Sequence, residues 1–115
     1  MNSQVCYDTD FSMEKTLAHF RTLVEIVERL RGPKGCPWDQ EQTQGSLTQY
    51  AIEEAYELVE AIESGDQLAV RDELGDYLFQ VVLQAQVARD EGLFELSAVL
   101  EGLNAKLMRR HPHVF

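Results

Sequence analysis

Apolar residues recur at intervals of three and four over most of the chain, which is the period of an amphipathic α-helix. The first such stretch begins at Met13 and is stopped by Gly32 and Pro33, which disfavour helix. Gly35 and Pro37 predict that the residues after it are irregular. The apolar face of this helix is expected to consist of Met13, Leu17, Phe20, Leu23, Val24, Ile26, Val27 and Leu30.

Two further helices are expected in the middle of the chain. Ser46 and Gln49 have the spacing of a capping box, so the second helix is predicted to begin at Ser46. Gly65 suits the position just after its C-terminus, and Asp66 suits the N-cap of the third helix. Gly92 is expected to end the third helix. The apolar faces are predicted to be Ile52, Ala55, Tyr56, Val59 and Ile62, and then Leu74, Leu78, Val81, Val82 and Ala85.

A fourth helix is expected from about Leu96 to Arg109, because Pro112 prevents its continuation. Its inward residues are predicted to be Val99, Leu100, Leu103 and Leu107. No segment alternates with a period of two, and no hairpin signal such as Asn-Gly is present. The pattern therefore predicts an all-α fold, an antiparallel bundle of about four helices joined by short loops.

With 115 residues, the chain is long enough for one domain. Residues 1–12 show no periodicity and are interpreted as a flexible leader, which leaves residues 13–115 as a single domain. The chain has no apolar run of roughly 18 residues and no signal peptide, so a cytoplasmic protein without a membrane span is expected. A formal net charge of −10 argues against nucleic-acid binding through phosphate neutralisation.

Acidic residues are grouped in the second and third helices. Glu54 and Glu57 are three apart on one helix, with Glu53 beside them, and Glu73 and Asp76 are three apart on the next. Residues at this spacing share a helix face, and antiparallel neighbouring helices can bring the two pairs together. Carboxylates that close repel one another unless a cation is present, and Mg²⁺ prefers oxygen ligands. The pattern thus favours a divalent metal site.

A solvent-exposed acidic face is the alternative interpretation of the same spacing. Against it, no lysine or arginine lies between Tyr50 and Val70, so no ion pair within the second helix can balance these charges. In the third helix the acids border an apolar stripe and continue into Gln80 and Gln84 on nearly the same face.

Two other features have two interpretations each. Lys106 and Arg110 share a face of the last helix, where they can either complement the helix dipole or hold phosphate oxygens. Trp38, in a polar loop, can stack on a nucleobase or cover the core.

Four segments resemble the MazG family of nucleoside triphosphate pyrophosphohydrolases, most closely the first of the two tandem domains found in well-known members. They are GCPWDQEQT (residues 35–43), EEAYE (53–57), ELGDYLFQ (73–80) and KLMRRHPHVF (106–115). The resemblance implies an all-α pyrophosphohydrolase fold. It also implies hydrolysis of a nucleoside triphosphate to the monophosphate and pyrophosphate, as part of nucleotide-pool housecleaning.

The resemblance also implies roles for residues. Mg²⁺, or Mn²⁺, is expected on four ligands, while Glu53 is expected to act as an accessory acid or base and Glu57 to share in catalysis. Lys106 and Arg110 are expected to contact the triphosphate, with Trp38 as a further substrate contact. The chain is expected to form a homodimer or a higher homo-oligomer. The four expected metal ligands are Glu54, Glu57, Glu73 and Asp76.

Two other functions are compatible with parts of this sequence. A non-catalytic helical dimerisation module could retain the same acidic cluster. Hydrolysis of phosphoribosyl-ATP is a related activity, but the loop around Trp38 and the His-Pro-His-Val-Phe ending favour the MazG interpretation.

Overall fold

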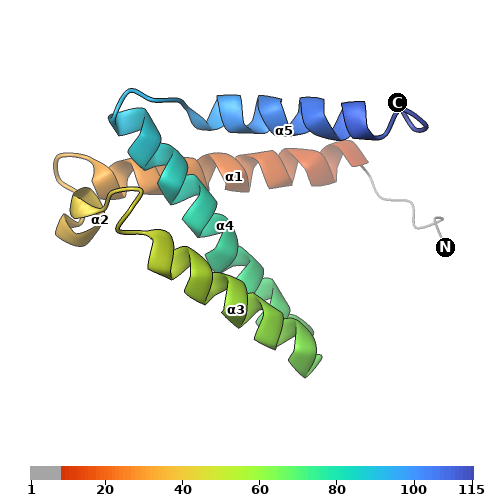
Figure 1. The fold of residues 1–115 in the computed structure, drawn as a ribbon, viewed down its shortest axis with the longest axis horizontal. Helices are drawn as coiled ribbons and strands as arrows, with labels where there is room; N and C mark the ends of the chain where they lie inside the picture. Colours follow the sequence, from red (N-terminus) through yellow and green to blue (C-terminus); the bar gives the residue numbers. More distant parts are fainter. Residues whose placement is uncertain (1–8) are drawn as a thin grey trace.

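The computed structural model describes residues 9–115, and from residue 12 onwards also the side chains. This part of the chain contains helices and no strand, so the predicted all-α fold is confirmed (Figure 1). Four long helices were expected, and a short fifth one is present. The helices are α1 (Thr9–Arg31), α2 (Pro37–Glu41), α3 (Thr48–Ser64), α4 (Gln67–Asp90) and α5 (Leu96–Arg110).

The hairpin between α3 and α4 forms as the sequence predicts. Gly65 has a φ of 78° and closes α3 in the left-handed conformation that glycine adopts without strain. Asp66 caps α4, because its Oδ1 accepts hydrogen bonds from the backbone amides of Leu68 at 3.0 Å and Ala69 at 3.4 Å. The tight turn leaves α3 side by side with the first part of α4, whose last part runs on past the start of α3 (Figure 1).

The predicted start of α3 is wrong by two residues. The helix begins at Thr48, and its N-cap, Leu47, has no side-chain cap. Ser46 is engaged one turn earlier: its Oγ accepts from the Thr43 amide at 2.8 Å, and the Thr43 Oγ1 accepts from the Ser46 amide at 3.0 Å. This reciprocal pairing has the pattern of a capping box. Ser46 therefore pairs with Thr43, three residues before it, and not with Gln49, three residues after it, as the sequence predicted.

Two other boundaries differ from the expectation. Helix α1 begins at Thr9, so residues 9–12 of the predicted leader are helical, and residues 1–8 lie outside the described residues. No glycine or proline interrupts residues 9–12, so nothing there breaks the helix. The stretch after α1, predicted to be irregular, contains α2, which has Pro37 in its first turn. The division into leader and domain stays a prediction.

The core lies where α1, α4 and the start of α3 meet. Val27, Leu47, Leu83 and Val87 are fully buried there, and Val82 is nearly so. They join elements far apart in the sequence, so burial of these side chains fixes how α1 crosses the α3–α4 hairpin. Partly buried apolar residues surround this cluster: Phe20, Leu23, Val24, Tyr50 and Phe79.

Several apolar faces that were expected to be inward are exposed in the single chain. Helix α5 contacts only α4 among the helices and buries none of its residues. The radius of gyration is 16.8 Å, compared with about 13 Å for a compact chain of this length. The physical reason is that none of the described helices lies against these faces. The residues concerned are Met13, Leu17, Ile26, Ile52, Tyr56, Val59, Ile62, Leu74, Leu78, Val81, Val99, Leu100, Leu103 and Leu107.

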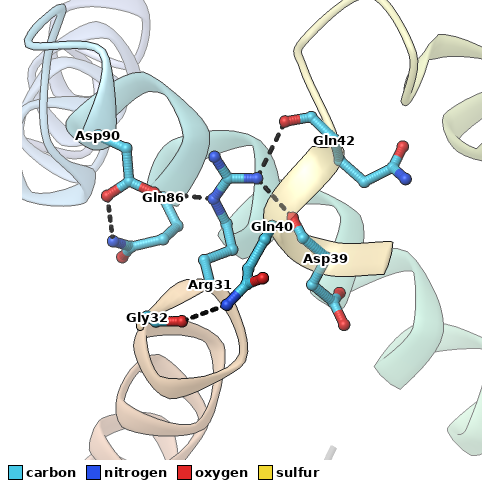
Figure 2. Close-up of polar contacts among 7 residues, drawn as sticks. All are labelled: Arg31, Gly32, Asp39, Gln40, Gln42, Gln86 and Asp90. Atoms are coloured by element: carbon cyan, nitrogen blue, oxygen red, sulfur yellow. Dashed lines mark hydrogen bonds and ion pairs between the residues drawn. The ribbon is translucent and has the colours of Figure 1, made fainter. Parts of the chain in front are cut away.

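A polar junction joins the ends of three elements. Arg31, at the last residue of α1, donates through Nε to Asp90 Oδ2 at 2.8 Å and through Nη1 to two main-chain carbonyls (Figure 2). These carbonyls belong to Asp39, at 2.6 Å, and Gln42, at 2.9 Å. Gln86 Nε2 donates to the other Asp90 oxygen at 3.0 Å. The Arg31 side chain is only 9% exposed, so these bonds form largely out of water.

None of the described helices is both long enough and apolar enough to cross a membrane. The cytoplasmic location expected from the sequence stays a prediction.

The turn after α1 should not tolerate a side chain at residue 35. A Cβ on Gly35 would lie 2.1 Å from the Leu30 carbonyl oxygen and 2.4 Å from that of Arg29. Both are main-chain atoms, so Gly35→Ala should lower the free energy of unfolding by about 2 kcal/mol or more in urea denaturation. Gly45→Ala is the control, because its nearest atom would be Thr43 Oγ1 at 3.9 Å. Equal stabilities of the two variants would contradict this account of the turn.

Candidate metal centre

Three carboxylates meet between α3 and α4. Glu54 and Glu57 lie one turn apart on α3, and Glu73 lies on the neighbouring α4. One carboxylate oxygen from each lies within 4.8 Å of the others. The close packing of the two helices therefore brings together three of the four metal ligands expected from the sequence.

Two of these carboxylates have oxygens that lack a partner. Glu54 Oε2 and Glu73 Oε2 are buried and accept no hydrogen bond from any described residue. A buried carboxylate oxygen without a partner costs free energy, because it has lost water and gained nothing in return. A cation between the helices would relieve this cost, so the donor set fits a hard divalent metal ion.

The electrostatics of the cluster agree with its geometry. The pKa of Glu54 is raised above its usual value by desolvation, and then by repulsion from Glu57 and Asp76. The pKa of Glu73 is raised by the same causes in the same order. The direction of both pKa shifts is the one expected for carboxylates held together without a counter-charge.

The other expected acids lie around this cluster. Asp76 is exposed, one turn after Glu73 on α4, and is not one of the three that meet within 4.8 Å. Its charge nevertheless contributes to the raised pKa of Glu54 and Glu73, so it lies near both. Glu53 is exposed on α3 and is likewise outside the group of three.

The expected substrate contacts are not brought to the carboxylates within one chain. Lys106 and Arg110 are exposed on α5, and no hydrogen bond or ion pair joins them to the acids in the described part of the chain. Trp38 is 44% exposed, and its ring forms a T-shaped pair with the Tyr50 ring, with a centroid distance of 5.5 Å and an interplanar angle of 77°. An exposed ring of this kind leaves both interpretations of Trp38 open.

Gln80 is a polar residue of this region that was not assigned to the site. Its Oε1 is buried without a partner among the described residues, and it lies one turn beyond Asp76 on α4. The sequence could have indicated this role, because Gln80 lies four residues after Asp76 and so shares the helix face that carries the acids. A cavity of about 380 Å³ begins there, with Ala51, Tyr77, Gln80, Gln84, Phe94 and Val99 in its lining.

Comparison with known proteins gives a consistent result. Residues 42–115 match the model of the MazG nucleotide pyrophosphohydrolase domain. The chain is 54% identical over 96 residues to the nucleoside triphosphate pyrophosphohydrolase/pyrophosphatase MazG of Thermotoga maritima, covering 84% of this chain and 38% of that protein. It is 50% identical over 94 residues to the nucleoside triphosphate pyrophosphohydrolase of Escherichia coli strain K12, covering 81% of this chain and 36% of that protein.

A third relative has no assigned activity. The uncharacterized protein YabN of Bacillus subtilis is 54% identical over 103 residues, covering 89% of this chain and 21% of that protein. The chain thus spans between about a fifth and two fifths of the length of these relatives. Glu54, Glu57, Glu73 and Asp76 all fall inside the segment that matches the family model.

Removing one carboxylate should stabilise the metal-free protein. The pKa values of Glu54 and Glu73 are raised above 4.5 in the folded chain, so the folded state binds more protons than the unfolded state above that pH. Their contribution to stability therefore falls as pH increases from 4.5 through the raised pKa values. In EDTA at neutral pH, Glu73→Gln should melt at a higher temperature than the wild type.

Millimolar Mg²⁺ should reverse this order, because the wild type retains all three carboxylates to bind it and Glu73→Gln does not. Glu63→Gln is the matched control, since this exposed acid of α3 lies outside the cluster. Thermal melts of the three proteins across pH, with EDTA and with Mg²⁺, provide the measurement. A wild-type melting temperature that Mg²⁺ leaves unchanged would count against a metal site.

Proposed function

Because the chain belongs to the MazG nucleotide pyrophosphohydrolase family, we propose that it hydrolyses a nucleoside triphosphate to the monophosphate and pyrophosphate with Mg²⁺. The observation that carries the proposal is the meeting of Glu54, Glu57 and Glu73, two of them with unpartnered buried oxygens. An excess of close negative charge is suited to binding a metal–polyphosphate complex.

In this proposal Glu54, Glu57, Glu73 and Asp76 hold Mg²⁺, with Mn²⁺ as a substitute. The bound ion would neutralise phosphate oxygens and lower the pKa of a water molecule. Asp76 joins the set because its charge acts on both Glu54 and Glu73 in the folded chain. An exposed side chain can turn toward a ligand at little cost, which suits a fourth ligand at the rim of the site.

A water molecule is the nucleophile in this scheme, and it attacks the α-phosphorus in line with the leaving pyrophosphate. Glu53 accepts the proton of that water, or Glu57 does so where it is free of the metal. The two are four residues apart on α3 and therefore share a helix face. Lys106 and Arg110 bind the phosphate oxygens that become pyrophosphate, and their charge counters the negative charge that develops as the bond breaks.

We further propose that the active form is a homodimer or a higher homo-oligomer. Many apolar residues of α3, α4 and α5 are exposed in the single chain, and extensive exposed apolar surface is typical of interfaces. A second copy of the chain would cover them. It would also give α5 a packing partner and so hold Lys106 and Arg110 in a defined place.

Release of pyrophosphate from a panel of nucleoside triphosphates tests the activity. Glu57→Gln keeps the size of the side chain but removes a charged ligand, so kcat/KM should fall about a hundredfold or more. Glu63→Gln, an exposed acid on the same helix, should keep the wild-type value.

The double variant Lys106→Ala, Arg110→Ala should lower kcat/KM while still binding Mg²⁺ in calorimetry.

Absence of pyrophosphate release from the folded wild type would reject the enzyme assignment. It would favour a non-catalytic helical dimerisation module that retains the acids.

Light scattering tests the assembly. Leu103, which is 47% exposed on α5, belongs to the apolar stripe. Leu103→Glu should place a charge in the interface and shift the protein toward the monomer, with its helix content retained in circular dichroism. Ala105→Glu is the matched control, because it adds the same charge at an exposed position of α5 on the side of the helix away from Leu100, Leu103 and Leu107. A wild type that is monomeric at every concentration would show the assembly proposal to be wrong.

A further inference from the structure

Arg31 connects the end of α1 to two other parts of the chain. It contacts α4 through Asp90, and it contacts residues 37–42, which carry Trp38 and are called the Trp38 segment below. We propose that Arg31 is a positioning residue for nucleotide binding, which acts by holding the Trp38 segment in place. The inference rests on the proposed function, to which it adds Trp38 as the further substrate contact expected from the sequence.

The Trp38 segment depends on outside contacts for its position. Its helix, α2, has five residues, far too few to be stable alone. Arg31 Nη1 bonds the Asp39 carbonyl at 2.6 Å and the Gln42 carbonyl at 2.9 Å, and so grips the C-terminal end of that helix (Figure 2). Gln40 Nε2 adds a bond to the Gly32 carbonyl at 2.5 Å. The segment is therefore fastened to the end of α1.

Arg31 is itself held in one orientation. Asp90 accepts from its Nε at 2.8 Å, and Gln86 binds the second oxygen of that carboxylate at 3.0 Å. The planar guanidinium directs different N–H groups to a carboxylate and to carbonyls at once, which a lysine ammonium cannot reproduce with the same geometry. With the side chain only 9% exposed, water does not replace these bonds easily.

The position of the Trp38 segment is linked to the carboxylate helix. The Trp38 ring meets Tyr50, which lies in the first turn of α3 and is partly buried against the core. Glu54 follows Tyr50 by four residues on that helix. Arg31 is thus connected through the segment to the start of the helix that carries Glu54 and Glu57, without touching either acid.

The consequence for the reaction is a separation of two kinetic effects. A residue that only places a substrate contact should change binding and leave the chemical step largely intact. Arg31→Lys should therefore raise KM for the nucleoside triphosphate about five- to tenfold and change kcat by less than about twofold.

Trp38 provides a direct readout of the segment, since it is the only tryptophan of the chain. In nucleotide-free protein, Arg31→Lys should increase the acrylamide quenching of Trp38 fluorescence. Arg89→Lys is the matched control: Arg89 is also an ion-paired arginine that joins α4 to α1, but its partners are Glu28 and Glu95 rather than the Trp38 segment. Its quenching and KM should equal those of the wild type.

A double-variant cycle tests whether Arg31 acts through Trp38. Trp38→Leu should raise KM by itself, and adding Arg31→Lys to it should raise KM little further. Asp90→Asn removes the charge that orients the guanidinium while leaving Arg31 in place, so it should shift quenching and KM in the same direction by less. This variant also decides the question if Arg31→Lys does not fold.

Each outcome bears on one part of the inference. Unchanged quenching in folded Arg31→Lys and Asp90→Asn would show that Arg31 does not hold the segment. Increased quenching with an unchanged KM would show that the segment does not serve nucleotide binding. Fully additive KM effects would contradict action through Trp38. A wild type that neither binds nor hydrolyses any triphosphate would reject the proposed function and the positioning role, whereas the quenching result on the Arg31 contacts would stand.

Discussion

Electrostatic repulsion between carboxylates on neighbouring helices is the constraint on which this structure depends. Glu54 and Glu73 would separate in a flexible chain, and they stay close because the hairpin at Gly65 and Asp66 holds α3 against α4. Burial of the apolar core supplies the free energy that offsets this repulsion, and the core lies nearer the other end of the hairpin. Stability and candidate chemistry therefore occupy different parts of the same pair of helices.

Because the core occupies only one end of the α3–α4 hairpin, the helices of the chain extend away from it. One small core joins α1, α4 and the start of α3, whereas the far parts of α3 and α4 and all of α5 have exposed apolar faces. Small domains bury a modest fraction of their surface, and association is a common way to add to it. A site at a surface that a second copy covers can exclude water more completely than one on an isolated chain.

Local signals in the sequence predicted the features that depend on neighbouring residues. Gly65 and Asp66 were identified correctly because a left-handed turn and an N-cap each have a specific residue preference. The meeting of Glu54, Glu57 and Glu73 followed from helical spacing and a short turn. Ser46 was assigned wrongly because Thr43 offers a competing hydroxyl three residues earlier. Arg31 could not be assigned, since its partners are 8, 11 and 59 residues away and two are main-chain carbonyls.

The carbonyl contacts of Arg31 have an evolutionary consequence. A main-chain carbonyl is present whatever side chain the residue carries, so the grip of Arg31 does not depend on the identity of residues 39 and 42. Mutations in this stretch can change its exposed side chains while its anchorage is inherited unchanged. Single mutations could in this way change what the Trp38 segment recognises, and the protein would stay folded after each of them.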